Sequence, residues 1–553
     1  MDKIKRVRNA IILLVLICLI FLGVNVNNLN KSKVTSNLVI YGDNIKTSYA
    51  PFTQNGSQYI SVDTISKTID KNIYYDKVTS EVIVTTYSDV LKFKMDNKKI
   101  FKNMKYVDIK NPAKNVDGQP YLPLDELSDV YNINVAYNDK QNIITIDKQN
   151  EDTGKVKKND VEVYSDLKTN STVLAKLKSG DTLTVYTDEL KHNRWYKVKT
   201  QDGIVGYISK KMVELNANEN KDNNDSNATV DTTINKNSTQ KICMFWQYGS
   251  DLNVLGQDKI SAVNVVSPTW FELQNAQGDI SSKFNQDYYN RAKNLGYKIW
   301  PIITNGIDSA NYSASDTSAL LDSEYSRQQL IDNIISLLNK YNLDGINIDF
   351  ENMKVEDKDM FTQFIRELAP MMRKNNKTLS VDMYFVNYID RTRVGDASDY
   401  VILMGYDQRG NWSSTPGSIS EISWVEKNLA SLLQDSNVPS EKIILGIPFY
   451  TRLWEEDDVS QTLDSTVYSM KNCASYLSEH SNLTPVLDKD AGQNYVQYTS
   501  GKVTYKLWIE DNDSVKRRVQ LVDKYNLAGV SGWKKGSELS STWQIIQDTL
   551  NEK

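Results

Sequence analysis

The stretch that decides the fold is LDGINIDFE, at residues 343–351. Side chains of a β-strand alternate between two faces, so Asn347, Asp349 and Glu351 share one face and the apolar residues between them share the other. This pattern predicts a barrel strand with its polar side facing inward and its apolar side covered by helices. Glu351 falls at the carboxyl end of the strand, where the active sites of such barrels lie.

Seven further apolar segments and the helical segments between them extend this prediction over residues 240–553. The eight expected strands are 241–248, 262–271, 297–304, 343–351, 379–385, 400–407, 442–450 and 527–533. Apolar residues recur with helical spacing between them, for example at 330–341 and 361–372. Eight strand–helix units predict an α/β fold, a (β/α)8 TIM barrel. The alternative is a doubly wound open sheet, but no glycine-rich phosphate loop follows the first strand.

Residues 455–510 lie between the last two expected strands and are too numerous for a simple loop. We expect them to form a small α+β insertion above the carboxyl-terminal face of the barrel.

The region before the barrel divides into two predicted domains. Five positions of residues 37–148 recur 62 residues later: Tyr59, Asp63, Ile65, Ile73 and Tyr75 as Tyr121, Asp125, Leu127, Val135 and Tyr137. This internal repeat predicts an α+β domain with helical turns at 63–70 and 125–132, whose two halves bury their apolar faces together. Residues 156–215 contain short alternating strands between turn signals, which predicts a small all-β barrel. Residues 216–239 contain eight Asn and no aromatic residue, which predicts a disordered linker.

The amino terminus predicts export. Four basic residues precede an uncharged run at residues 10–24. Such a pattern retains the start of the chain in the cytoplasm and sends the rest across the membrane. We expect residues 1–30 to form a cytoplasmic start and an uncleaved signal anchor, with a cleaved signal peptide as the alternative. The remaining domains would then lie outside the membrane, at the cell wall.

Composition excludes several function classes. The chain has 65 basic and 70 acidic residues, and no segment is strongly basic, so nucleic acid is not an expected partner. Two histidines and three scattered cysteines argue against a histidine-built metal site, a Ser-His-Asp triad and a disulfide framework. We expect neither a cofactor nor a metal ion, and we expect a monomer.

Carboxylates are the chemistry that remains. Asp344, Asp349 and Glu351 are expected to lie near one another, and mutual repulsion and burial should raise at least one pKa. A carboxyl that stays protonated near neutral pH is what a glycosidic oxygen requires as a proton donor.

Three families resemble parts of this sequence. LDGINIDFE is similar to the strand-four signature D-x-x-D-x-D-x-E of glycoside hydrolase family 18, and LMGYD at 403–407 and SGWKKG at 531–536 match further family signals. GQPYLPLDELSDVYNINVAYNDKQNIITI resembles the amino-terminal domain of copper amine oxidases, a stalk domain of bacterial wall proteins. SGDTLTVY…NRWYKVKTQDGIVGYIS resembles a bacterial SH3-like domain.

The family 18 resemblance implies a set of roles. Glu351 would be the general acid and later the base, while Asp349 would orient the 2-acetamido group of the substrate, whose carbonyl oxygen acts as nucleophile with net retention. Tyr406 would hydrogen-bond that acetamido group, Met404 and Asp407 would line the same subsite, and Trp533 would form the floor under the sugar. Aromatic residues at the ends of strands one and two either stack on flanking sugars or belong to the core: Trp246, Tyr248, Trp270 and Phe271.

Asn347 departs from the family pattern, which usually has an aspartate at that position. DGINIDFEN looks more like the branch that cleaves bacterial cell-wall or spore-cortex glycan. We hypothesise that Asn347, a substrate-site residue, holds Asp349 by a neutral hydrogen bond and leaves Asp349 more readily ionised. An unchanged pH–rate profile in Asn347→Asp would contradict this.

Three functions compete. The first is an N-acetylglucosaminidase that acts on peptidoglycan and is tethered outside the membrane through residues 10–24. The second is a chitinase-like hydrolase of soluble or foreign polymer. The third is a non-catalytic sugar-binding wall protein, which the presence of Glu351 disfavours and the loss of aspartate at position 347 favours.

Overall fold

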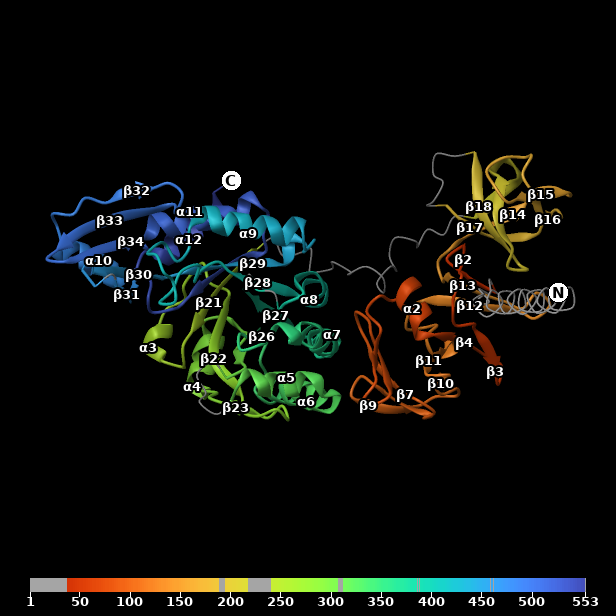
Figure 1. The fold of residues 1–553 in the computed structure, drawn as a ribbon, viewed down its shortest axis with the longest axis horizontal. Coiled ribbons are helices and arrows are strands. Elements are labelled where there is room, and N and C mark those ends of the chain that lie inside the picture. Colours follow the sequence, from red (N-terminus) through yellow and green to blue (C-terminus); the bar gives the residue numbers. More distant parts are fainter. Residues whose placement is uncertain are drawn as a thin grey trace, which may run out of the picture. The chain divides into compact units, whose positions relative to one another are not determined.

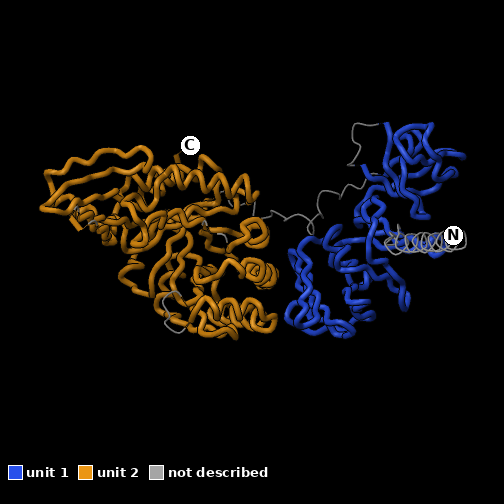
Figure 2. Tube along the Cα trace, viewed as in Figure 1, with its two compact units in different colours: residues 1–229 blue, residues 230–553 orange. Residues whose placement is uncertain are grey.

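The computed structural model describes residues 37–187, 194–216, 240–306, 312–384, 386, 388–457, 459–460 and 462–552. The chain divides into two compact units, residues 1–229 and 230–553, each of which is considered by itself (Figure 2). The expected anchor at residues 10–24 and nearly all of the expected linker at 216–239 lie outside the described residues. None of the helices in the described ranges is long and apolar enough to cross a membrane.

The second unit is built on a closed sheet of parallel strands, as predicted (Figure 1). The barrel strands are β21 (Ile242–Gln247), β22 (Val265–Leu273), β25 (Ile302–Thr304), β26 (Gly345–Asp349), β27 (Thr378–Met383), β28 (Tyr400–Met404), β29 (Ile443–Pro448) and β35 (Gly529–Trp533). Pairing of β21 with both β22 and β35 closes the sheet. The short strand β24 (Lys298–Ile299) also pairs with β22, and β23 (Ile280–Ser282) extends β22 as a hairpin.

Helices cover the outside of the barrel because their apolar stripes face the outer side chains of the strands. They are α3 (Leu252–Leu255), α4 (Gln286–Asn294), α5 (Ala314–Asp322), α6 (Glu324–Lys340), α7 (Lys358–Lys374), α8 (Arg391–Ala397), α9 (Ile422–Gln434), α11 (Asn512–Lys524) and α12 (Thr542–Asn551). On α7, for example, Phe361, Phe364 and Leu368 are at most 1% exposed. Inside the barrel the core includes Met244 and Trp300.

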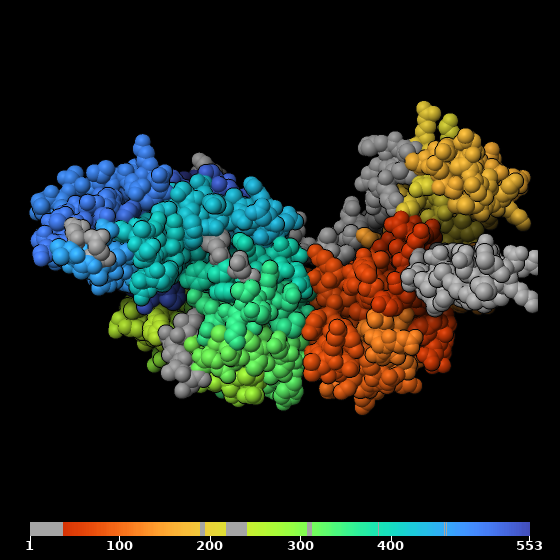
Figure 3. Space-filling view, in the orientation of Figure 1, coloured from red at the N-terminus to blue at the C-terminus, as the bar shows by residue number. Residues whose placement is uncertain are grey.

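The predicted α+β insertion is present between β29 and α11. It consists of β30 (Tyr450–Asp457), β31 (Thr462–Ser469), α10 (Met470–Glu479), β32 (Val486–Asp488), β33 (Gln493–Ser500) and β34 (Val503–Trp508), in the sheet order β31-β30-β34-β33-β32. It begins at Tyr450 rather than at 455, because Tyr450 already pairs with Ser469 of β31. In the space-filling view its light-blue surface adjoins the cyan surface of residues near α9 (Figure 3). The Ile422 backbone N–H, which donates to the carbonyl oxygen of Ala491 at 3.0 Å, is part of that contact.

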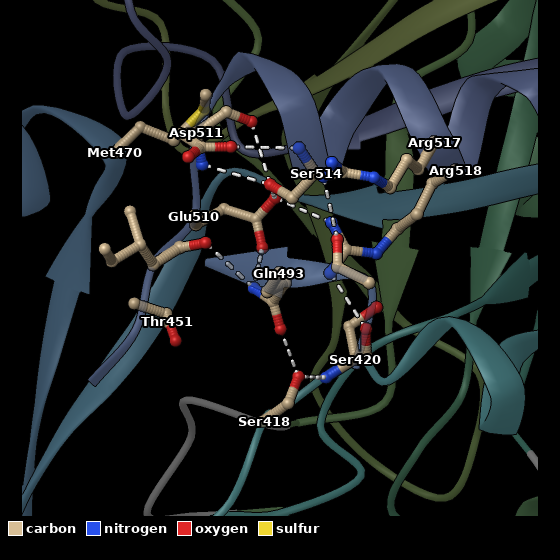
Figure 4. Close-up of polar contacts among 12 residues, drawn as sticks. Ser418, Ser420, Thr451, Met470, Gln493, Glu510, Asp511, Ser514, Arg517 and Arg518 are labelled. Carbon is tan, nitrogen blue, oxygen red and sulfur yellow. Dashed lines mark hydrogen bonds and ion pairs between the residues drawn. The ribbon is translucent and has the colours of Figure 1, made fainter. Parts of the chain in front are cut away.

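A buried polar network joins the insertion to the barrel helices (Figure 4). Glu510, on the return from β34 to α11, accepts hydrogen bonds from Arg518 Nη1 at 2.6 Å and from Gln493 Nε2 at 2.9 Å. Arg518 Nη2 donates to the carbonyl oxygen of Ser420 at 2.8 Å, and the Ser418 hydroxyl donates to Gln493. This network therefore links β33, α11 and the loop that follows β28.

The first unit begins with the repeat domain, which is built mainly of strands. They are β1 (Leu38–Ile40), β2 (Asp43–Asn44), β3 (Phe52–Gln54), β4 (Ser57–Ser61), β5 (Tyr74–Asp76), β6 (Glu81–Thr85), β7 (Val90–Lys94), β8 (Lys99–Lys102), β9 (Lys105–Asp108), β10 (Lys114–Val116), β11 (Gln119–Pro123), β12 (Ile133–Asn138) and β13 (Ile143–Lys148). The predicted helical turns are shorter than expected, α2 (Val62–Thr68) and the 3-10 turn η1 (Leu124–Glu126). The two copies meet where β4 pairs antiparallel with β11, and both contribute to one core.

The rest of the first unit is a seven-stranded antiparallel sheet, in agreement with the predicted small all-β barrel. Its strands are β14 (Asp152–Val156), β15 (Val161–Tyr164), β16 (Val173–Leu177), β17 (Thr182–Tyr186), β18 (Trp195–Thr200), β19 (Val205–Ser209) and β20 (Val213–Asn216). Asp147 of β13 accepts a hydrogen bond from the Tyr186 hydroxyl at 2.7 Å and pairs with Lys199. Asp147 is 6% exposed and Lys199 is 8% exposed, so this polar contact between the two domains is buried.

Candidate active site

Strand β26 positions the predicted site as its alternation requires. Asn347 is 0% and Asp349 is 7% exposed inside the barrel, while Phe350 packs outward against α7. Glu351 lies two residues after the end of the strand, at the carboxyl end of the barrel. The turn that carries Glu351 is held by Asn305, whose Oδ1 accepts the backbone N–H of Glu351 at 3.0 Å.

Asn305 was not among the predicted site residues. It is fully buried just after β25, and its amide also donates to the carbonyl oxygen of Asn352 at 2.8 Å. Nothing in the local sequence around 305 indicates this role, since the partners lie 46 and 47 residues along the chain.

Glu351 has the properties of a proton donor at neutral pH. Burial is the largest cause that raises its pKa, to about 9, and the neighbouring Asp349 and Asp407 raise it further. The side chains of Glu351 and Asp349 also hydrogen-bond each other, which favours the protonated form of Glu351. The prediction that one clustered carboxyl has a raised pKa thus agrees with the geometry.

Asp349 carries a polar atom in need of a partner. Its Oδ1 is buried and makes no hydrogen bond to any described residue. Burial, and then repulsion from Asp382, raise the pKa of Asp349 well above its usual value. A ligand N–H or O–H above the strand would satisfy this oxygen, because an unpaired buried acceptor is costly.

The carboxylate cluster differs from the prediction in one member. Asp344, expected beside Asp349, lies before the strand begins and pairs with Lys293 at 3.0 Å. The third buried carboxylate is Asp382 of β27, which is 5% exposed. Asp382 accepts a hydrogen bond from Asn347 Nδ2 at 2.8 Å.

The expected role of Asn347 therefore needs correction. Its Oδ1 accepts the indole N–H of Trp246 at 2.7 Å, and its amide N–H group donates to Asp382 rather than to Asp349. With 0% exposure Asn347 lies beneath the site and not on its surface. Burial and repulsion from Asp382 raise the pKa of Asp349, and Asn347 is not among the causes. Easier ionisation of Asp349 beside Asn347 than beside an aspartate at position 347 stays a prediction.

Trp246 is likewise below the site. It is 1% exposed and makes edge contacts with Tyr406 and Trp533, at centroid distances of 6.4 and 5.9 Å. Its position is that of a core residue that supports Asn347, so of the two interpretations offered for Trp246 the packing one holds.

A further carboxylate, the half-buried Asp407, follows β28. Asp407 has φ 57° and accepts hydrogen bonds from the Tyr450 hydroxyl and, at 3.4 Å, from the Tyr384 hydroxyl. Tyr406 is 3% exposed and contacts Tyr450 edge-on at 6.2 Å. Met404 is 4% exposed and belongs to the barrel core. Tyr384 and Tyr450, which were not predicted, reach Asp407 because Tyr384 directly follows β27 and Tyr450 begins β30.

A cleft of about 230 Å3 opens onto the carboxylates. It is lined by Tyr248, Thr269, Trp270, Phe271, Glu272, Lys283, Thr304, Asp349, Glu351, Trp533 and Lys534. Tyr248 is 57% exposed, with the Lys534 ammonium 4.9 Å from its ring centroid. Trp270 is 1% exposed, and its indole N–H donates to Ser250 at 2.7 Å. Trp270 therefore packs in the wall of the cleft and does not offer its ring face for stacking on a sugar.

In the described ranges, no group of three or more His, Cys, Asp or Glu side chains is arranged to hold a metal ion.

Family models match three parts of the chain. The model for glycosyl hydrolases family 18 matches residues 203–538, that for the copper amine oxidase N-terminal domain matches 39–146, and that for the bacterial SH3 domain matches 159–214. All three resemblances seen in the sequence are thereby confirmed.

Named relatives are similar over somewhat less than half of this chain. The glycosylase YvbX of Bacillus subtilis is 26% identical over 46% of this chain and 76% of its own length. The cortical fragment-lytic enzyme of Bacillus subtilis is 24% identical over 45% of this chain, and the match spans 59% of that enzyme.

Solved structures agree on the fold. The Chromobacterium violaceum chitinase covers 57% of this chain and 100% of its own, with a TM-score of 0.51 and 21% identity. The spore cortex-lytic enzyme SleL of Bacillus megaterium covers 56% of this chain and 74% of its own, with a TM-score of 0.50 and 20% identity.

Proposed function

The chain belongs to glycosyl hydrolase family 18, and from that premise we propose that its barrel hydrolyses the bond at β-1,4-linked N-acetylglucosamine in peptidoglycan. The observation that carries the proposal is Glu351, a carboxyl with a pKa of about 9 beside Asp349 at the floor of an open cleft. A protonated carboxyl in that position supplies the proton that a glycosidic oxygen needs in order to leave.

In the proposed reaction the Glu351 proton passes to the glycosidic oxygen as the bond from that oxygen to the anomeric carbon breaks. The carbonyl oxygen of the substrate's own 2-acetamido group bonds to the anomeric carbon, and an oxazolinium ion forms. Asp349 accepts the acetamido N–H through its unpartnered Oδ1 and offsets the positive charge. Glu351, now a carboxylate, removes a proton from water. The water oxygen bonds to the anomeric carbon as the bond from that carbon to the acetamido oxygen breaks, which opens the oxazolinium ring with net retention.

The rest of the cleft would hold the sugar. Tyr406 and Asp407 are proposed to contact the acetamido group, and Trp533 to lie under the distorted ring. Tyr248, as an exposed aromatic residue at the rim, is suited to stack on a neighbouring sugar.

Peptidoglycan is preferred to chitin for three reasons. A copper amine oxidase N-terminal domain and a bacterial SH3 domain, which we expect to contact the wall, precede the barrel. The relatives of the chain include enzymes described as cortical fragment-lytic. Two lysines line the cleft: Lys534, and Lys283, whose ammonium also pairs with Glu272 at 3.9 Å. Peptidoglycan carries carboxylates on its lactyl and peptide groups, whereas chitin is a neutral polymer, so ammonium groups beside the substrate favour the former.

The location of the protein belongs to the same proposal. We infer that residues 1–30 direct the chain out of the cytoplasm and that it remains at the outer side of the membrane, in the cell wall, because basic residues precede the apolar run at 10–24.

The test is product analysis with the chain from residue 31 onward, on peptidoglycan and on chitin oligomers, beside Glu351→Gln. New reducing-end N-acetylglucosamine from peptidoglycan, absent with Glu351→Gln, is the expected result. Cleavage of chitin alone would move the assignment to the chitinase-like function. Binding of glycan without cleavage of either polymer would indicate a sugar-binding wall protein.

A further inference from the structure

The bottom of the active site contains a buried hydrogen-bonded chain across three strands. Trp246 of β21 donates to Asn347 of β26, and Asn347 donates to Asp382 of β27, at 2.7 and 2.8 Å. All three residues are at most 5% exposed. An amide in this position has a fixed orientation, because its oxygen must face the indole N–H and its nitrogen must face the carboxylate.

The register of the sheet brings Asp382 beside Asp349. Ile348 pairs with Val381, so the next residues along the two parallel strands are Asp349 and Asp382. Their side chains point to the same inner face, and neighbouring strands lie about 4.8 Å apart. Neither carboxylate forms an ion pair with a lysine or arginine of the described chain.

Two such carboxylates cannot both be ionised at low cost, since like charges at this separation in a buried site repel strongly. One proton between them removes the repulsion and leaves a single negative charge. The carboxylate beside Asp349 thus comes from Asp382 on β27, because position 347 of β26 carries an amide.

We propose that Asp382 is a positioning residue that shares one proton with Asp349, and that Asn347 holds Asp382 in place for this exchange. The inference rests on the proposed function, since it assigns Asp349 a negative charge when the oxazolinium forms. With the proton on Asp382, Asp349 is ionised and faces the cation; with the proton on Asp349, Asp382 carries the charge. The number of protons is the same in both forms.

Other titratable groups face this pair and take part in its electrostatics: Glu351 after β26, Tyr384 and Tyr388 after β27, and Tyr406 after β28. Burial raises the pKa of Asp382 well above its usual value, although the Asn347 hydrogen bond opposes that rise. The tyrosines stay neutral at physiological pH, because burial raises their pKa values.

The first test is the pH dependence of kcat/KM in Asp382→Asn. Loss of the neighbouring charge lowers the pKa of Asp349, so the acid limb of the profile moves to lower pH by about one pH unit. We expect kcat at the optimum to fall by about tenfold or more, because Asp349 loses its partner. The exchanged pair Asn347→Asp/Asp382→Asn returns a carboxylate to the site and restores the acid limb.

The matched control is Ser380→Ala, at a buried residue on the same strand as Asp382. The substitution removes the 3.2 Å hydrogen bond from the Ser380 hydroxyl to the carbonyl oxygen of Ile346 and does not change the charge. Its profile should be that of the unmodified chain. An Asp382→Asn profile equal to that of Ser380→Ala would overturn the proposal. If Asp382→Asn does not fold, the exchanged pair decides, and a folded exchanged pair whose acid limb is displaced contradicts proton sharing.

A second measurement does not depend on turnover. Carbon-13 resonances of labelled aspartate carboxyls, assigned with Asp349→Asn and Asp382→Asn, should show Asp349 and Asp382 titrating in the same two coupled steps. Independent single steps would overturn the proposal. If peptidoglycan is not cleaved but the two residues titrate together, the proposed function fails while proton sharing stands.

Discussion

Phe350 and Phe364 lie parallel, with ring planes 1° apart and centroids 5.8 Å apart. Phe350 is the residue between Asp349 and Glu351, so this contact docks the outer face of β26 onto α7 and leaves both carboxylates facing the cleft. The apolar outer face of the strand and its polar inner face are therefore set by the same alternation.

Replacement of Phe350 should lower the stability of the barrel. Phe350→Ala removes a side chain that is 4% exposed and should lower the free energy of unfolding by about 3–5 kcal/mol. Phe350→Leu keeps most of the volume and should cost less. Denaturant unfolding of the barrel unit measures the free energy of unfolding of both variants. An equal loss in Phe350→Ala and Phe350→Leu would contradict the packing argument.

Glu351→Gln should abolish proton donation while it preserves the cleft. We expect kcat to fall by at least about 100-fold, the usual contribution of a general acid, with little change in the affinity for a substrate oligosaccharide. Glu356→Gln, an exposed site close in sequence, is the matched control and should keep full activity. A Glu351→Gln enzyme with activity near that of the control would remove Glu351 from the mechanism.

The same substitution should stabilise the fold at neutral and alkaline pH. The pKa of Glu351 is raised from 4.5 to about 9, so the folded state holds a proton that the unfolded state releases above pH 4.5. The contribution of this group to stability is thus complete below pH 4.5 and is lost as pH rises towards 9, by about 1.4 kcal/mol per pH unit.

Thermal unfolding at pH 5 and pH 8 checks this sign. The amide introduced by Glu351→Gln does not ionise, so the variant should exceed the unmodified chain in stability by more at pH 8 than at pH 5. A difference that is the same at both pH values would show that Glu351 ionises as readily in the folded state as in the unfolded one.

The barrel could be predicted because each strand carries its own local signal. Eight apolar segments and the alternation at 343–351 were sufficient to predict the fold and the position of Glu351 at the carboxyl end of a barrel strand. Asp382 was missed although LSVDMYF places Ser380, Asp382 and Tyr384 on one face of a strand. Asp382 lies beside Asp349 because β27 pairs with β26, and strand register brings together residues 35 positions apart in the sequence.

Trp412 could not be singled out from the sequence, since an exposed aromatic residue in a loop has no periodic signal. It is 68% exposed in the loop that follows Asp407, at the carboxyl end of β28. We expect Trp412→Ala to raise KM for long oligosaccharides by about two- to tenfold, which is the range of an aromatic contact. The kcat value for a short chromogenic substrate should not change.

Tyr106→Ala is the matched control for Trp412, because Tyr106 is 75% exposed but belongs to the first unit. It should leave KM for soluble oligosaccharides unchanged. An equal rise in KM for both variants, or none for Trp412→Ala, would exclude a sugar contact at Trp412.

Arg518→Met should loosen the insertion by leaving Glu510 buried without its cation. Both residues are at most 1% exposed, and removal of one partner of a buried ion pair costs about 3–5 kcal/mol. Burial already raises the pKa of Glu510 to about 7 although Arg518 opposes the rise, so loss of the arginine raises it further.

The pH dependence of that loss separates an unpaired charge from a simple cavity. Glu510 favours the folded state below pH 4.5 and less so as pH rises through its folded pKa. In Arg518→Met the group stays protonated at pH 5, so the deficit in unfolding free energy should be smaller at pH 5 than at pH 8. Glu510→Gln added to Arg518→Met should recover most of the loss at pH 8. Equal deficits at the two pH values, with no recovery in the double variant, would mean that Arg518 contributes by packing alone.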